Sequence, residues 1–272
     1  MPPPATIDPV TTFAGAMRLV AAMLAAEQGC PPDQITDDRV HLGEHPAGAR
    51  RHRLARPYPR RDPAFAAVSV GSGAVVSAGR DILPDVRAIF AGAERDQVFE
   101  PERLAAIAAL LRPHQLTVVG PYLRFLCTPT IHRHRPPPAG YLIGLELRPD
   151  DRRLDSLDPD RWPNAISRRR PITTEAAVVA ELAGQVVGVA TARADSPRLW
   201  QIGIDVAEPH RGRGLGAALT SALARFIIDN GNAAWYGVAP ANVASVNTAL
   251  ASGFRYAWVE AYAYPTSRDP SS

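Results

Sequence analysis

One stretch constrains the fold more than any other part of the 272-residue chain. Residues 200–226 read WQIGIDVAEPHRGRGLGAALTSALARF, which is an apolar strand, a short turn with a proline, a glycine-rich segment and an alanine-rich helix. Glycines at the start of a helix leave backbone N–H groups uncovered, and the helix dipole adds partial positive charge there. This order of parts predicts a site for an anion such as a phosphate at a strand-to-helix junction.

The composition narrows the choice of phosphate motif. All 30 basic residues are arginine, so a Walker-type loop ending in Gly-Lys-Ser/Thr is excluded, as is Schiff-base chemistry on lysine. Gly212, Gly214 and Ala217 formally satisfy the dinucleotide fingerprint Gly-x-Gly-x-x-Gly/Ala. However, AEPH separates them from the strand, and AAWYGVAPAN offers no carboxylate for a ribose. The sequence therefore favours another phosphate compound over a dinucleotide.

Charge and cysteine content restrict the partners and the compartment. The net charge is only +3, from 30 basic and 27 acidic residues, which argues against a nucleic-acid partner. The 2 cysteines, Cys30 and Cys127, have no metal-type spacing and form no disulfide framework, which suits a reducing compartment. No secretory signal and no run of roughly 20 apolar residues is present. We expect a cytoplasmic protein with no membrane segment and no metal.

The pattern along the chain predicts two domains. Residues 1–150 mix helices and strands and suggest an α+β N-terminal domain, followed by a charged, proline-bearing linker over 151–170. Residues 171–265 are more orderly, with a hairpin, a strand, the glycine loop and its helix, a strand, a second helix and a last strand. Residues 266–272 form a tail.

Two basic segments of the first domain read as exposed loops. HPAGARRHRLARPYPRRDP, residues 45–63, concentrates arginines among prolines and alanines. IHRHRPPP carries His132 and His134, a pair that could bind a metal. No carboxylate or cysteine stands nearby at ligand spacing, so an exposed loop is favoured.

Residues 173–264 resemble the GNAT superfamily of acyl-CoA-dependent N-acyltransferases. The signature Arg/Gln-x-x-Gly-x-Gly/Ala matches Arg211-x-x-Gly214-x-Gly216, and the hairpin, IGIDV, RGRGLG, AAWYGV, NVASVN and a closing Gly253-Phe254 follow in the family's order. The resemblance implies an α/β (α+β) fold with a mixed, mostly antiparallel sheet and flanking helices. The smaller α+β domain before it is either a degenerate GNAT-like half or an unrelated unit, and we expect it to shape acceptor specificity.

The resemblance also implies acetyl-CoA as the cosubstrate. Its pyrophosphate would lie on the glycine loop, and its pantetheine arm would lie in a gap between the IGIDV and AAWYGV strands, where the Val206 N–H polarises the thioester. Asn242 and Ser245 suit helix caps as well as ligand contacts. The predicted coenzyme-binding residues are Ile204, Val206, Arg211, Gly212, Arg213, Gly214, Leu215, Gly216, Ala217, Asn242, Ser245 and Asn247.

The residues that would transfer protons depart from the family's pattern. In many members of the family, a tyrosine four residues before the Gly-Phe pair gives a proton to the departing thiolate. This chain has Ala249 at that position. For Asp205, anchoring the turn is the alternative to a role as base. The predicted catalytic residues are Asp205, Glu260 and Tyr262. His210 and Tyr236 are further candidates.

The function that the resemblance implies is transfer of an acetyl group from acetyl-CoA to a primary amine of a small molecule. Ala249 supports an alternative, a non-catalytic module that binds and senses acyl-CoA. An amine on a protein or peptide is a further alternative acceptor, and a homodimer is compatible with the sequence.

Overall fold

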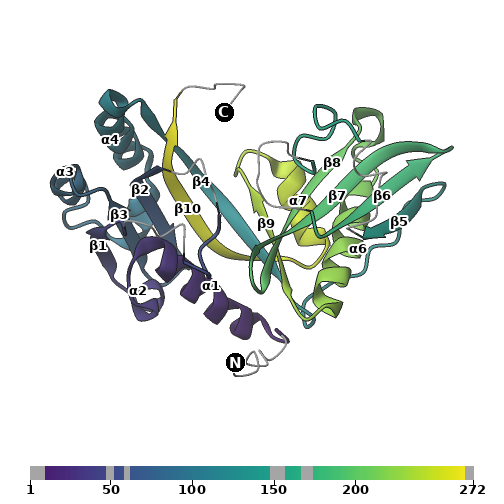
Figure 1. Ribbon diagram of the computed structural model, residues 1–272, viewed down its shortest axis with the longest axis horizontal. Coiled ribbons are helices and arrows are strands. Elements are labelled where there is room, and N and C mark those ends of the chain that lie inside the picture. The colour runs from purple at the N-terminus through teal and green to yellow at the C-terminus, as the bar shows by residue number, and fades with distance from the viewer. Residues whose placement is uncertain (1–9, 47–51, 58–61, 148–156, 167–173, 267–272) are drawn as a thin grey trace, which may run out of the picture.

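The computed structural model describes residues 10–46, 52–57, 62–147, 157–166 and 174–266. Ten strands form one sheet in the order β1-β3-β2-β10-β4-β9-β8-β7-β6-β5 (Figure 1). Neighbouring strands are antiparallel except for the pairs β1–β3 and β8–β9. The mixed, mostly antiparallel sheet with flanking helices that the sequence predicts is confirmed.

The helices and strands alternate along the chain in two groups. The first group comprises α1 Phe13–Gln28, α2 Pro32–Thr36, β1 Val40–Glu44, β2 Asp62–Ser69, β3 Ala74–Ala78, α3 Leu83–Ile89, α4 Pro101–Leu111 and β4 Leu116–Cys127. The second group comprises β5 Leu142–Leu147, β6 Ala176–Leu182, β7 Gln185–Ser196, β8 Leu199–Val206, α6 Leu215–Asp229, β9 Ala233–Val238, α7 Val243–Ala251 and β10 Arg255–Pro265.

Alternating side chains divide the core between the two faces of the sheet. On β9, Ala234 and Tyr236 belong to the apolar cluster beneath α6, whereas Ala233 and Trp235 belong to the cluster beneath α1. The apolar cluster beneath α3 and α4 contains the β2 and β3 residues whose side chains point away from α1. Helix α1 therefore covers one face, and α3, α4, α6 and α7 cover the other.

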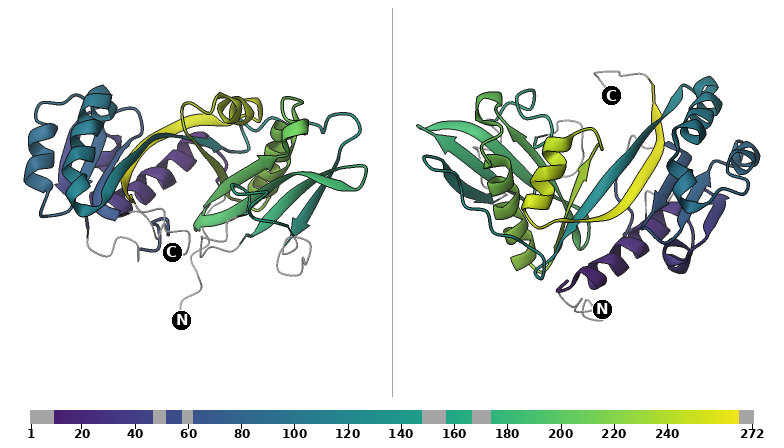
Figure 2. Two further views of the ribbon diagram at one scale, coloured as in Figure 1. Left: turned by 90° about the horizontal axis from the view of Figure 1, so that it is seen from above. Right: turned by 180° about the vertical axis from the view of Figure 1, so that it is seen from behind.

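Strand β4 joins the two groups of elements. It lies between β9 and β10, and β10 returns from the end of the chain to pair with both β4 and β2. Figure 2 shows β4 and β10 as long strands that run between the two halves of the molecule. The sheet is therefore continuous across the division expected between the two domains, and β5, before the expected linker, pairs with β6 after it.

Each of the two loops that the sequence predicts to be exposed contains a residue that is not. Arg56 in the segment 45–63 is buried, with 3% of its surface exposed, while residues 47–51 and 58–61 of that segment lie outside the described residues. His132 packs against α6, where its Nε2 lies 3.0 Å from the Ser221 carbonyl oxygen. The first expectation was wrong for Arg56, because its partners Glu27 and Glu260 are far away in the sequence. The segment 131–138 is mostly exposed as expected, although His132 is held against α6.

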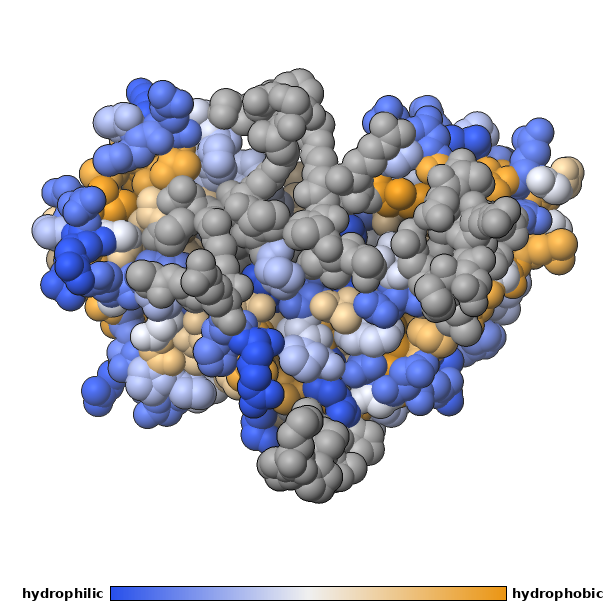
Figure 3. All heavy atoms as spheres, in the orientation of Figure 1, coloured by the Kyte–Doolittle hydropathy of each residue, from blue (hydrophilic) through white to orange (hydrophobic). Residues whose placement is uncertain are grey.

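The described surface is mostly polar in the view of Figure 3, with apolar residues scattered over it. The large apolar side chains that are exposed include Leu142 and Leu145 on the edge strand β5. In the described ranges, no helix combines the length and the apolar character needed to cross a membrane.

Candidate functional site

The glycine loop leads into α6 as the sequence predicts. Gly212 and Gly214 have φ angles of +73° and +83°, in the left-handed region that favours glycine. Gly214 is the N-cap of α6, where no side chain caps the helix and no acidic residue lies in the first turn. A Cβ atom at either glycine would meet no other heavy atom within 4 Å. The backbone around the two glycines is thus uncovered, and a helix N-terminus without a capping side chain suits an anion.

The two arginines of the loop differ in their contacts. The Arg211 Nε donates to the Val206 carbonyl oxygen at 2.9 Å, which holds the loop against the end of β8. Arg213 is exposed beside it. Both guanidinium groups are close enough in sequence to the helix start to add positive charge there.

Strands β8 and β9 separate next to this loop. Their pairing runs from Leu199–Ala233 to Ile202–Tyr236 and then stops. Strand β8 continues to Val206, whereas β9 beyond Tyr236 pairs with β4. A gap therefore opens from the Ile202–Tyr236 pair toward the glycine loop, in the place that the resemblance implies.

Backbone donors of β8 point into this gap. The Ala207 N–H donates to the Val187 carbonyl oxygen on β7 at 2.9 Å. Since N–H groups of successive residues in a strand point to opposite sides, those of Val206 and Ile204 point away from β7. They are directed toward the gap, where a carbonyl or amide of a ligand could accept from them.

Helix α7 flanks the gap on the side of α6. A Cβ atom at Gly216 would lie 3.5 Å from the Thr248 Oγ1 and 3.8 Å from the Ile204 Cδ1, so α6, α7 and β8 meet at this point. The Asn242 side chain accepts from the Ser245 N–H at 3.1 Å and caps α7. Asn247, by contrast, is exposed on the helix.

Asp205 lies on the opposite face of β8 from Ile204, where it holds the segment 157–166. Its Oδ2 accepts the N–H groups of Asn164 and Ala165, both at 2.8 Å, and its Oδ1 accepts from the Asn164 Nδ2 at 2.6 Å. A side chain at Gly203 would collide with the Asn164 carbonyl oxygen, so the glycine admits this segment. The structure thus shows the anchoring contacts that were the alternative to a role as base.

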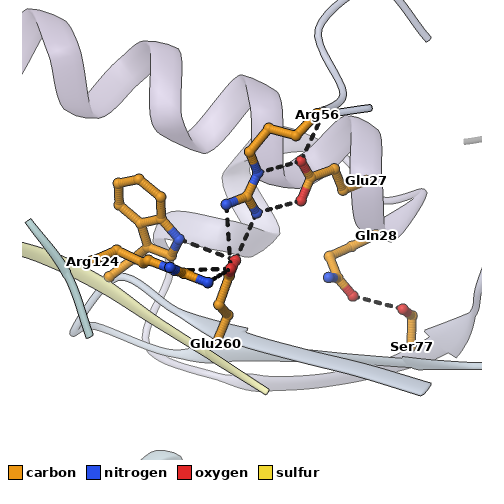
Figure 4. Close-up of polar contacts among 7 residues, drawn as sticks. Glu27, Gln28, Arg56, Ser77, Arg124 and Glu260 are labelled. Atoms are coloured by element: carbon orange, nitrogen blue, oxygen red, sulfur yellow. Dashed lines mark hydrogen bonds and ion pairs between the residues drawn. The ribbon is translucent and has the colours of Figure 1, made fainter. Parts of the chain in front are cut away.

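Glu260 lies in a buried cluster of charges on the α1 face of the sheet (Figure 4). The carboxylate is 1% exposed, and its Oε1 accepts from the Arg124 Nη2 at 2.6 Å. Its Oε2 accepts from the Arg56 Nη2, also at 2.6 Å, and from the Trp258 Nε1 at 3.3 Å. Arg56 in turn binds Glu27 of α1 through two bonds of 2.6 Å. The positive charges of Arg56 and Arg124 thus balance the negative charge of Glu260.

Tyr262 and Tyr236 are in different surroundings. Tyr262 packs against Tyr122, with ring centroids 6.0 Å apart, on the α1 face. Tyr236 is 3% exposed and ends the paired part of β9 at the gap. An aromatic residue in a strand is typical of a core, so the sequence favours a packing role for Tyr236. The end of the β8–β9 pairing has no local sequence signal.

The thiols of the chain do not suit nucleophilic catalysis. Burial raises the pKa of Cys127 to about 12 and that of Cys30 to about 11, with the charge of Asp33 adding to the second shift. Both are therefore neutral thiols at neutral pH, whereas a nucleophilic cysteine reacts as the thiolate.

Comparison with known proteins places these features in a family. Residues 131–254 match the model of the acetyltransferase (GNAT) family. No curated protein matches the chain.

Several solved structures are similar to part of the chain. A GCN5-related N-acetyltransferase from Kribbella flavida has 19% identity and a TM-score of 0.43, and the match covers 61% of this chain and 66% of that one. A GCN5-related N-acetyltransferase-like protein from Streptococcus suis has 17% identity and a TM-score of 0.43, with 60% and 69% covered. The yncA protein from Salmonella typhimurium, solved with its cofactor acetyl-CoA, has 20% identity and a TM-score of 0.29, with 34% and 65% covered.

These structural similarities are weak, and the chain spans about two thirds of the length of each protein. The family assignment therefore depends on the match to the family model, which contains β8, the glycine loop, α6, β9 and α7. Residues 131–254 are therefore a GNAT acetyltransferase domain.

Proposed function

We propose that the protein transfers an acetyl group from acetyl-CoA to a primary amine of a small-molecule acceptor. The observation that carries the proposal is the gap between β8 and β9, which leads from the open N-terminus of α6 to the Ile202–Tyr236 pair. A ligand with a pyrophosphate at one end and a thioester at the other matches a site with an anion cradle joined to a row of backbone donors.

The residues of the domain would share the binding of acetyl-CoA. The N–H groups from Gly212 to Ala217 receive the pyrophosphate, and Arg211 and Arg213 add charge. The N–H groups of Ile204 and Val206 bind the arm and its thioester carbonyl. Ser245 and Asn247 border the arm from α7, and Asn242 holds that end of the helix in place.

Transfer requires an amine nitrogen that is neutral when it attacks the thioester carbonyl carbon. The Val206 N–H would stabilise the oxyanion that forms, which is worth about 3 kcal/mol for a well-aligned donor. Asp205 is our proposed acceptor of the amine proton, on the face of β8 opposite Ile204, where its carboxylate also holds residues 164 and 165. Tyr262 and the buried Glu260 lie on the α1 face, where the N-terminal elements would shape the acceptor site.

The direct test measures release of free thiol from acetyl-CoA across amines, amino acids, polyamines, aminoglycosides and peptides, with calorimetry of acetyl-CoA binding alongside. Binding together with thiol release in the presence of a small amine is the expected result. Binding without release from any acceptor would identify a sensor module instead, and release with peptides alone would identify a protein or peptide acceptor. Absence of binding at millimolar acetyl-CoA would overturn the proposal.

A further inference from the structure

We infer that Tyr141 and His210 position the glycine loop for the coenzyme, because their contact holds the turn that leads into the loop. The inference rests on the coenzyme binding that the proposed function requires, and it names residues that set the strength of that binding. The sequence makes His210 a candidate for catalysis, whereas in this role it acts through the loop and contacts no reacting atom.

The glycine loop has little packing of its own. Gly212 and Gly214 have no side chain, and a Cβ atom added at either would meet no heavy atom within 4 Å. Glycine also has more backbone freedom than any other residue, so a segment with two glycines is ordered only as far as its neighbours hold it. A loop that presents successive N–H groups to a pyrophosphate therefore needs an anchor.

The turn before the loop provides this anchor. His210 ends a short 3₁₀ helix, Glu208–His210, and stands directly before Arg211. The bond from the Arg211 Nε to the Val206 carbonyl oxygen is local, since the two residues are five positions apart. Among the described residues, the hydrogen bond of His210 with Tyr141 is the one that ties residues 208–214 to a distant segment, 69 positions away in the chain.

Two contacts define the geometry of this pair. The Tyr141 hydroxyl oxygen lies 3.0 Å from the His210 Nδ1. The two rings also meet edge to face, with their centroids 5.7 Å apart and their planes at 86°. A hydroxyl both donates and accepts, so the hydrogen bond forms with either neutral tautomer of His210 and with the protonated ring. The pair thus fixes the position and the direction of the His210 ring.

Tyr141 is itself held firmly in the domain. It is buried in the same apolar cluster as Leu215, the first residue of α6. Its N–H donates to the Pro138 carbonyl oxygen at 3.2 Å, and the next residue, Leu142, begins β5 and pairs with Glu181 of β6. The contact with His210 therefore connects the loop to the core of the acetyltransferase domain.

An anchored loop favours coenzyme binding in a specific way. A loop that already has its binding conformation loses less conformational entropy when the pyrophosphate arrives, so the affinity for acetyl-CoA is higher. The pyrophosphate and the thioester are at opposite ends of the pantetheine arm, and the pair holds only the pyrophosphate end. Loss of the contact should therefore weaken coenzyme binding and leave the chemical step unchanged once the coenzyme is bound.

The first test compares Tyr141→Phe, which removes only the hydroxyl, with Tyr256→Phe, a control on β10 at a residue that is 52% exposed. Calorimetry measures the Kd for acetyl-CoA, and thiol release at saturating acetyl-CoA measures kcat with the best acceptor. We expect the Kd of Tyr141→Phe to rise about fivefold, the usual effect of one hydrogen bond, and its kcat to stay within about twofold of the wild type. The control should match the wild type in both measurements.

A double-mutant cycle shows whether Tyr141 acts through His210. His210→Ala removes the other partner and should also raise the Kd for acetyl-CoA at least about fivefold. In the His210→Ala background, Tyr141→Phe should cause no further change, because the bond is already lost. Equal losses in both backgrounds would overturn the inference, since Tyr141 would then act independently of His210.

The remaining results separate the inference from the proposed function. An unchanged Kd in Tyr141→Phe would overturn the inference and leave the acetyltransferase intact. A fall in kcat at saturating acetyl-CoA with an unchanged Kd would also overturn it, since the pair would then act on the chemical step. A wild-type protein that binds acetyl-CoA but releases no thiol would overturn the proposed transfer alone, because the Kd comparison is still made, whereas a wild type that does not bind acetyl-CoA would overturn both.

Discussion

At the scale of single residues, Gly214 has a backbone conformation that links the loop to α6. Its φ of +83° is in the region that costs other residues about 1–2 kcal/mol. Gly184, in the turn between β6 and β7, has a similar φ of +76°, and an added Cβ at either glycine would meet no atom within 4 Å. The two glycines are therefore matched in strain and differ in position.

This pair gives a prediction about coenzyme binding. Gly214→Ala and Gly184→Ala should lose similar amounts of stability in urea. Only Gly214→Ala should bind acetyl-CoA more weakly, by about tenfold in Kd by calorimetry, because its methyl group stands where the phosphates approach. If both variants bound acetyl-CoA like the wild type, the pyrophosphate would not lie on this loop.

At the scale of elements, the loop after β4 is held on α6 by a histidine. The Ser221 hydroxyl donates to the Arg133 carbonyl oxygen at 2.9 Å, and the His132 ring lies against the Ser221 carbonyl. Burial lowers the pKa of His132, and the charges of Arg225 and His134 add to this, whereas the Ser221 hydrogen bond and Asp229 oppose it. The ring therefore remains neutral in the folded protein at a pH where it is protonated in the unfolded chain.

The lowered pKa of His132 predicts a loss of stability in acid. Because the unfolded state binds the proton more readily, stability from this group is complete above its ordinary pKa of about 6.5 and falls as the pH drops below it. Urea unfolding at about pH 8 and about pH 5.5 should show a larger loss for wild type than for His132→Gln. Identical losses would mean that the ring titrates normally in the folded protein.

The same elements show which features a sequence reveals. The apolar IGIDV segment, the turn and the glycines before α6 are contiguous, so local pattern is enough to predict β8, the loop and the helix. The pairing of Arg124 on β4 with Gly237 on β9 joins distant segments and has no local signal. The same is true of Arg56, which reads as a loop residue because its partners Glu27 and Glu260 are far away in the chain.

At the scale of the whole molecule, β4 joins the two groups of elements in one continuous sheet, which predicts that they unfold together. It supplies the neighbour of β9 in the acetyltransferase domain, and β10 supplies the neighbour of β2. The cluster of Glu27, Arg56, Arg124 and Glu260 connects α1, a loop, β4 and β10 at the same place. Replacing a residue of this cluster should therefore lower the stability of both groups of elements, including segments that are distant from it in the sequence.

Replacing Glu260 tests this connection. Glu260→Gln keeps the shape of the side chain but removes the charge that two buried guanidinium groups share. Loss of one partner from a buried ion pair typically costs about 3–5 kcal/mol, because the remaining charge is left uncompensated. Arg225, whose pair with Asp229 on α6 is exposed, offers the control variant Arg225→Gln, which should cost less than about 1 kcal/mol.

Two probes distinguish a connected molecule from two independent halves. Fluorescence reports on the 4 tryptophans, of which Trp235 and Trp258 lie next to the cluster with their rings 5.7 Å apart. Far-UV circular dichroism reports on all helices. In urea, both probes should follow one transition in the wild type and in Glu260→Gln, with the variant's midpoint lower by the same amount in each. A transition in which fluorescence changes first, while most of the dichroism remains, would show that the halves unfold separately and that β4 does not couple them.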